Sequence, residues 1–225
     1  MGEDILLERK DKRTMRRIQK LLFPAIFCLL LFQASDAACQ TGLEESGERW
    51  TNNRQPPDKV LAAIGVQPGM VIGEVGAGRG RYTVQLSAKV ESAGKIYAED
   101  IDRGSLDHLK ERCANAGIRN VEIILGKVDD PQFPKSTLDM VFMILTYHHL
   151  AEPVALLKNL IPSLKPDATV VVVDPDPVKD RDRSGRESTS KEEIEKEAGE
   201  AGFVLVRVET FLEKDNIFIL RAKRN

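Results

Sequence analysis

Glycines in a short loop are the residues of this chain whose type and spacing most clearly indicate chemistry. The loop, V-G-A-G-R-G over Val75–Gly80, follows an apolar segment at Met70–Gly73 and has an acid, Glu74, two places before its first glycine. A helix-compatible segment, Arg81–Val90, comes next. Glycines let the backbone turn tightly and approach a ligand, and a helix N-terminus offers free N–H groups. The order strand, glycine turn, helix therefore predicts a site for a mononucleotide-like cofactor.

The spacing of these glycines narrows the type of cofactor. A dinucleotide fingerprint reads G-x-G-x-x-G, but Arg81 stands at the place of its third glycine and Gly80 comes one place early. The pattern E-x-G-x-G-x-G therefore favours a cofactor without a pyrophosphate. For the loop taken alone, a glycine turn that holds no ligand remains the alternative.

Acids at the end of a second apolar segment provide the next candidate contact. The run K-I-Y-A-E-D-I-D at Lys95–Asp102 is typical of a strand that ends in carboxylates. An acid at the tip of the second strand, about 20 residues beyond such a glycine loop, binds the ribose hydroxyls of a nucleotide. We expect Asp100 to take this role, because Glu99 would point to the other face of the strand and Asp102 lies in the loop. The alternative is that these acids only cap the helix that follows.

Two further turns are expected at the same edge of the sheet. A short strand at Val121–Gly126 leads into the polar turn Lys127–Pro131, and a strand at Leu138–Leu145 leads into T-Y-H-H-L at Thr146–Leu150. Open α/β sheets bind their ligands at the carboxyl ends of the strands. Both turns are therefore predicted to lie beside the glycine loop.

From about Trp50 to about Pro175, these motifs resemble those of the class I S-adenosylmethionine-dependent methyltransferases. The pattern E-x-G-x-G-x-G resembles the first motif of that family, and G-K-I-Y-A-E-D-I-D resembles its G-K-V-Y-A-V-D-I-D pattern. The strand beginning at Leu138 has the D-hydrophobic-V opening of the family's fourth strand. The D-D-P turn together with Y-H-H resembles a small, exported bacterial subgroup. The resemblance implies S-adenosylmethionine as the cofactor.

The expected fold is α/β and Rossmann-like, with a seven-stranded, mostly parallel sheet, helices on both faces and a C-terminal antiparallel hairpin. Apolar runs alternate with helical patterns along the chain, as in a parallel sheet covered on both faces. The expected helices after the first are Gly104–Ala116, Pro153–Leu164 and Lys191–Glu200. The expected later strands are Ala168–Val173, Phe203–Val208 and Asn216–Leu220.

The resemblance also implies a set of cofactor contacts. These are Glu74, Gly76, Ala77, Gly78, Gly80, Asp100, Ile101, Val128, Asp129, Leu145 and Thr146. Many members of the family carry an acid beside the adenine, directly after the glycine that ends the third strand. This chain has Lys127 there, and we assign the acid's role to Asp129.

Methyl transfer from a sulfonium is an in-line displacement, for which a protein supplies alignment and sometimes a base. His148 is the candidate base, Tyr147 a candidate for orienting the acceptor, and Asp174 a further group at the ligand edge. If Thr146–Leu150 is extended, only one of His148 and His149 faces the pocket. The alternative is that one histidine packs against the next helix and the other lies in solvent.

Composition limits the partners that we expect. The chain has 225 residues, a formal net charge of −2 and 5% aromatic residues. Without a basic stripe or stacking aromatics, nucleic acid is not a favoured partner, and we expect a small-molecule acceptor. The three cysteines show no metal-ligand spacing, so no metal site is predicted. The sequence leaves the oligomeric state open.

Two other functions remain open at this point. One is a non-catalytic protein that binds S-adenosylmethionine or a nucleoside on the same fold. The other, less favoured by the position of Arg81, is a nucleotide-dependent oxidoreductase.

The N-terminus, residues 1–38, is similar to an export signal. An apolar run at Leu21–Phe32 follows basic residues and precedes small ones, and it is too short to be a confident membrane span. Met15 would begin a compact signal, and cleavage after Ala37 would release an exported protein, periplasmic or secreted. The alternatives are a lipid on Cys39, an uncleaved membrane anchor, or a cytoplasmic protein. We expect a polar linker at 39–53 and the methyltransferase domain at 54–225.

Overall fold

The structure is a computed structural model that describes residues 45, 47–181 and 187–223. All of them belong to one compact unit, Glu44–Asn225. The expected signal segment, 1–38, lies outside the described residues. Within the described part of the chain, no helix has the length and apolar character needed to cross a membrane.

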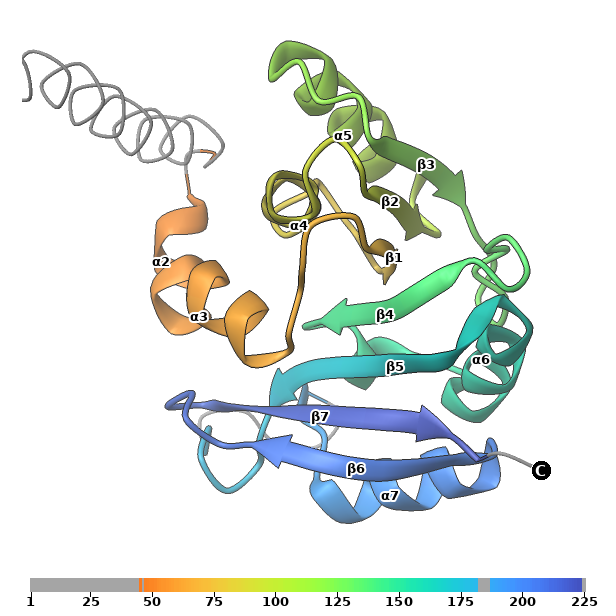
Figure 1. Cartoon of the computed structure of the whole chain (residues 1–225). Coiled ribbons are helices and arrows are strands. Elements are labelled where there is room, and N and C mark those ends of the chain that lie inside the picture. Colours follow the sequence, from red (N-terminus) through yellow and green to blue (C-terminus); the bar gives the residue numbers. More distant parts are fainter. Residues whose placement is uncertain (1–44, 46, 182–186, 224–225) are drawn as a thin grey trace, which may run out of the picture. The chain divides into compact units, whose positions relative to one another are not determined.

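The chain alternates strands with helices, as the sequence predicts (Figure 1). The strands are β1 (Val71–Val75), β2 (Lys95–Asp100), β3 (Val121–Leu125), β4 (Leu138–Ile144), β5 (Leu164–Pro175), β6 (Phe203–Glu209) and β7 (Asp215–Ala222). The helices are α2 (Glu48–Arg54), α3 (Pro57–Ala63), α4 (Thr83–Val90), α5 (Arg103–Asn115), α6 (Pro153–Leu160) and α7 (Lys191–Glu200). Two 3₁₀ turns are η1 (Tyr147–His149) and η2 (Ile161–Ser163).

The strands form one seven-stranded sheet in the order β3-β2-β1-β4-β5-β7-β6. The pairs from β3 to β5 are parallel, whereas β7 is antiparallel to both β5 and β6. The expected fold, including the C-terminal hairpin, is therefore confirmed. The strand order reverses between β1 and β4, and in such sheets ligands bind at this point, beyond the carboxyl ends of the strands.

Helices cover both faces of the sheet (Figure 1). One apolar cluster joins α4 and α5 to one face, through residues such as Leu86 and Leu109. A second cluster joins α6 and α7 to the other face, through Leu156 and Ile194. The β-branched run Val170–Val173 has no exposed surface because its side chains alternate between the two clusters.

The structure differs from the expected elements at several places: α3 was not among the expected helices, and β5 begins at Leu164 instead of Ala168. Residues 39–53 were expected to be a linker, but α2 forms over Glu48–Arg54. Trp50 is the apolar residue of α2 and is 65% exposed, so the helix lacks the apolar stripe by which a helix is usually predicted. The helix expected at Pro153–Leu164 ends at Leu160. Pro162 has no N–H to donate back along the helix, and η2 follows instead.

Candidate functional site at the carboxyl edge of the sheet

The glycine loop follows β1 and turns directly over the end of β2. Gly76, Gly78 and Gly80 have φ angles of 71°, 54° and 88°, which side-chain-bearing residues rarely adopt. A Cβ added to Gly76 would overlap the side chain of Thr146, so the loop approaches the end of β4 closely. The N–H of Ala77 donates to the carbonyl of Glu99 at 2.8 Å. The loop is therefore anchored to the neighbouring strand.

Asp100 lies at the end of β2, as predicted for the residue that binds ribose. Its Oδ2 accepts from the N–H of Gly78 at 2.8 Å, and its Oδ1 accepts from the N–H of Asp102 at 2.8 Å. The residue is half-buried. A carboxylate has about four lone-pair sites, so acceptor capacity remains for a pair of hydroxyls. Asp102 caps α5 by accepting from the N–H groups of Gly104 and Ser105, and its pKa is lowered first by a bond from the Ser105 hydroxyl and then by these two backbone bonds.

A cavity of about 360 Å³ opens beside Asp100. It is lined by Val75, Gly76, Glu99, Asp100, Ile101, Lys127, Val128, Leu145, Thr146, His149, Leu150, Ala151 and Leu156. Ile101 and Val128 are 59% and 48% exposed, so their apolar side chains are accessible to a ligand in this cavity. Apolar walls with a carboxylate at one end suit an adenine ring joined to a ribose. The residues present thus fit the adenosyl part of S-adenosylmethionine.

Six of the predicted cofactor contacts line this cavity: Gly76, Asp100, Ile101, Val128, Leu145 and Thr146. The other five, Glu74, Ala77, Gly78, Gly80 and Asp129, are not among its lining residues. Glu74 is 1% exposed and accepts from the Thr83 hydroxyl at 2.6 Å. Burial raises the pKa of Glu74 to about 8, and its bond ties α4 to β1. The side chain of Asp129 is exposed. The roles of these five residues toward the cofactor stay predictions.

Polar contacts attach helix α2 and its C-cap residue Gln55 to the glycine loop. Arg81 donates to Asn52 at 3.2 Å and to Gln55 at 2.9 Å. Arg112 of α5 donates to both carboxylate oxygens of Glu48, at 2.7 and 2.9 Å, and to the carbonyl of Arg79. The helix was not predicted from the sequence, because Glu48–Arg54 is a mixture of charged and amide residues without apolar periodicity.

A buried group of hydrogen-bonded side chains lies at the carboxyl ends of β4 and β5. The side chains of His148 and Asp174 are 1% and 0% exposed. His148 Nδ1 lies 3.0 Å from both carboxylate oxygens of Asp174, and the backbone N–H of His148 donates to Oδ2 at 3.0 Å. The hydroxyl of Thr189 also donates to Oδ2, at 2.7 Å. The structure thus brings together two of the three predicted catalytic candidates, His148 and Asp174.

The segment that carries both histidines is the 3₁₀ turn η1 and not the extended segment that we considered. The two imidazole rings are in contact, with centroids 3.9 Å apart. His148 turns toward Asp174, whereas His149 is exposed and lines the adenosyl cavity. Tyr147, the third candidate, is 3% exposed and donates its hydroxyl to Glu197 at 2.7 Å. Burial, followed by the bond to Glu197, raises the pKa of Tyr147, so its hydroxyl stays protonated.

A second cavity, of about 490 Å³, adjoins the first. His149, Leu150 and Ala151 line both cavities. The rest of its lining comes from Tyr147, His148, Pro153, Glu187, Ser188, Thr189, Glu193 and Glu197. Through this polar cavity, His148, which is held by Asp174, lies next to the adenosyl cavity.

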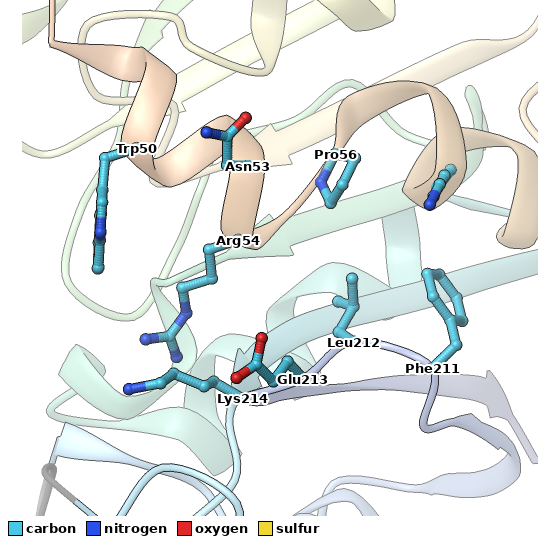
Figure 2. A pocket seen from close by; sticks show the side chains of 9 residues that line it. Trp50, Asn53, Arg54, Pro56, Phe211, Leu212, Glu213 and Lys214 are labelled. Atoms are coloured by element: carbon cyan, nitrogen blue, oxygen red, sulfur yellow. The ribbon is translucent and has the colours of Figure 1, made fainter.

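A third cavity, of about 370 Å³, lies between α2 and the turn that joins β6 to β7. Figure 2 shows Trp50 and Phe211 at its two ends, with Arg54 extending from α2 toward Lys214. Arg54 forms ion pairs with Asp180 at 2.6 Å and with Asp215 at 2.7 Å. None of the predicted site residues lines this cavity, so we assign it no part in cofactor binding.

Replacing Asp100 by alanine should weaken binding of S-adenosylhomocysteine by about 1–3 kcal/mol, the range for a lost hydrogen bond to a charged group. Isothermal titration calorimetry of the two proteins measures the difference. Asp107→Ala is the matched control, because Asp107 is an exposed acid on the neighbouring helix α5. A thermal melt checks that the loss of the Gly78 bond has not unfolded the loop. Equal affinity of wild type and Asp100→Ala would remove Asp100 from the site.

Comparison with known proteins agrees with this geometry. A family model described as a methyltransferase domain matches residues 72–167. The solved structure of a SAM-dependent methyltransferase from Aquifex aeolicus is 30% identical, with a TM-score of 0.68. That alignment covers 73% of this chain and 88% of the Aquifex chain.

Two curated relatives match over shorter stretches. The demethylmenaquinone methyltransferase of Staphylococcus aureus (strain MRSA252) is 28% identical over 116 residues, which are 52% of this chain and 47% of the relative. The ribosomal RNA small subunit methyltransferase A of Pelotomaculum thermopropionicum is 38% identical over 78 residues, 35% of this chain and 25% of the relative. The chain thus spans less than half the length of either relative.

Proposed function

The chain belongs to the class I S-adenosylmethionine-dependent methyltransferases, and from this premise we propose that it methylates a small molecule held beside His148. S-adenosylmethionine is its cofactor, and the adenosyl cavity next to Asp100 has the chemistry to hold it. The observation that carries the proposal is the imidazole of His148, which lines the adjoining cavity and is held from behind by the buried Asp174. A cofactor pocket alone would not require a buried, oriented imidazole beside it.

In the proposed mechanism, Asp174 orients His148. An ionised carboxylate only accepts hydrogen bonds, so the proton of the imidazole lies on Nδ1, 3.0 Å from Asp174. The other ring nitrogen, Nε2, then has a free lone pair and takes the proton that an acceptor O–H or N–H loses. Bound S-adenosylmethionine supplies an electrophilic methyl group on its sulfonium. The apolar walls of the adenosyl cavity and the carboxylate of Asp100 fix the cofactor for in-line transfer.

The class of acceptor is part of the proposal. The cavity beside His148 is lined by Glu187, Glu193, Glu197 and His149, which favour a polar acceptor with an O–H or N–H group. The relative from Staphylococcus is a demethylmenaquinone methyltransferase, so quinols and phenols belong among the acceptors to test. We favour a small molecule over nucleic acid because the chain has a formal net charge of −2.

A screen for S-adenosylhomocysteine release tests the function. Purified protein is incubated with S-adenosylmethionine and, in separate reactions, soluble naphthoquinols, phenols, amines and carboxylic acids. We expect at least one acceptor to raise product release well above the rate without acceptor, and that increase to disappear in His148→Ala. If the protein binds the cofactor but no acceptor in any class reacts, the non-catalytic binding protein becomes the better account.

We also propose that the protein is exported and cleaved after Ala37. The support is the order of basic, apolar and small residues before that position. N-terminal sequencing of the protein from its native host distinguishes this cleavage from a lipid on Cys39 or an uncleaved anchor.

A further inference from the structure

Glu99 is a buried acid in the adenosyl cavity to which neither the family motifs nor the proposed mechanism assigns a role. It is 2% exposed and lies next to Asp100, one residue before the end of β2. Its partners in the sheet are Val75 of β1 and Ile124 of β3, both packed in the cluster under α6 and α7. The side chain of Glu99 therefore points to the face of the sheet opposite to that of Asp100. It lines the same cavity because the cavity continues around the end of β2.

The backbone on both sides makes room for the Glu99 carboxyl. A Cβ added to Gly126, directly after β3, would overlap Oε1 of Glu99. On the other side, the backbone N–H of Gly76 lies near enough to lower the pKa of the carboxyl. The Glu99 carboxyl thus lies across the ends of β1, β2 and β3, against the wall that Lys127 and Val128 continue.

The surroundings of Glu99 favour its neutral form. Its pKa is raised to about 8: burial is the largest cause, the charges of Asp100 and Asp130 also raise the pKa, and the backbone N–H of Gly76 lowers it. Lys127 and His149 are the basic side chains that line the same cavity. A neutral carboxyl carries one O–H donor and keeps an acceptor oxygen.

An adenine edge presents the complementary pair, an amino group beside a ring nitrogen that accepts. Side-chain amides pair with adenine through this same combination of one donor and one acceptor. Lys127 stands where other family members carry an acid, but an ammonium group has donors only. Asp129 is exposed and outside the cavity lining. Glu99 is the buried side chain of the cavity that supplies both kinds of group.

We propose that the Glu99 carboxyl binds the adenine of the cofactor, accepting a hydrogen bond from the 6-amino group and donating one to the neighbouring ring nitrogen. This assignment replaces Asp129 as the acid beside the adenine. The assignment of Glu99 rests on the proposed function in one respect, which is that this cavity must hold the adenosyl group. It does not depend on which acceptor is methylated.

Calorimetric titration with two ligands tests the proposal on the full chain. One ligand is S-adenosylhomocysteine, and the other is its analogue with purine in place of adenine, which lacks the 6-amino group. We expect wild type to prefer S-adenosylhomocysteine about 10-fold, the scale of one or two hydrogen bonds. Glu99→Leu should lose this preference, because it removes both groups. Glu99→Gln should keep it, because an amide offers the same donor and acceptor.

The pH dependence of binding provides an independent readout. Between pH 7 and pH 9, the neutral fraction of an acid with a pKa of about 8 falls about 10-fold. Affinity of wild type for S-adenosylhomocysteine should therefore fall by up to about 10-fold over this interval as the O–H donor is lost. Glu99→Gln should show a smaller fall. Asp100, Asp130, Lys127 and His149 are present in both proteins, so the difference between them isolates Glu99.

Glu122→Gln is the control for substitution of an acid by an amide on the neighbouring strand, since the Glu122 side chain is 52% exposed and paired with Lys95. It should bind both ligands as wild type does. Equal losses of both ligands in Glu99→Leu, or no loss of either, would overturn the assignment of Glu99. If wild type binds neither ligand, the proposed function fails before Glu99 is tested, and the inference fails with it.

Discussion

Replacing Arg54 by methionine should lower the free energy of unfolding by about 3–5 kcal/mol, the cost of breaking a buried ion pair from one side. The Arg54 side chain is 7% exposed, and the side chains of Asp180 and Asp215 are 2% and 0% exposed. Its guanidinium donates to both oxygens of Asp215, at 2.8 and 2.7 Å, and to Asp180 at 2.6 Å. Methionine fills a similar space but leaves two buried carboxylates without their main partner.

Urea denaturation of wild type and Arg54→Met at neutral pH measures this loss of unfolding free energy. Lys191→Met is the matched control, because Lys191 forms an exposed pair with Glu195 at 3.5 Å, and such pairs contribute about 0.3–0.5 kcal/mol. A loss below about 1 kcal/mol in Arg54→Met would contradict a structural role for the cluster.

The loss of unfolding free energy caused by Arg54→Met should also depend on pH. Burial raises the pKa of Asp180, but its hydrogen bonds to Arg54 and Lys214 outweigh burial and lower it overall. An acid whose pKa is lowered in the folded state stabilises the fold above its unfolded value and loses that contribution as pH falls. The difference between wild type and Arg54→Met should therefore shrink below about pH 4.

Replacing His148 by alanine should lower kcat for methyl transfer by about 10²–10⁴-fold, the range for loss of a general base. The imidazole is held by Asp174 through Nδ1, and its other nitrogen is the proton acceptor in the proposed mechanism. Since the adenosyl cavity is not built from the His148 ring, the dissociation constant for S-adenosylhomocysteine should change less than about 3-fold. Kinetics with the acceptor found by the screen, together with calorimetry, measure both quantities.

Asp174→Asn separates catalysis from folding. Asparagine has the size of Asp174 but carries no charge. Its oxygen can still accept a hydrogen bond, whereas its NH2 group cannot accept the bonds that His148 and Thr189 donate to the carboxylate. We expect a fall in kcat of about 10-fold or more with a folded protein. If His148→Ala lowers cofactor affinity and leaves kcat unchanged, His148 is a structural residue and the proposed base is wrong.

Much of the fold follows from local patterns in the sequence. The β-branched run at Val170–Val173 predicts a strand buried on both faces, and the structure confirms it. Asp100 was predicted at the tip of β2 because its distance from the glycine loop is set by one strand–helix–strand unit. Such features depend on neighbouring residues and on the period of apolar residues.

Features held by distant partners could not be predicted in this way. Helix α2 depends on Arg54, whose partners lie 126 and 161 residues away along the chain. The orientation of His148 depends on η1, a 3₁₀ turn that no periodicity signals in so short a segment. Strand alternation correctly placed Glu99 on the face opposite to Asp100, but it carried no information about a cavity that continues around the strand end.

Calorimetric titration of S-adenosylmethionine into the purified protein, beside Gly76→Val, tests the central claim most directly. Gly76 has a φ of 71°, and any Cβ there would overlap Thr146 at the cavity wall. We predict micromolar binding by wild type and no measurable binding by Gly76→Val, with both proteins folded by circular dichroism. A folded wild type that binds no S-adenosylmethionine would contradict the assignment of this cavity to the cofactor.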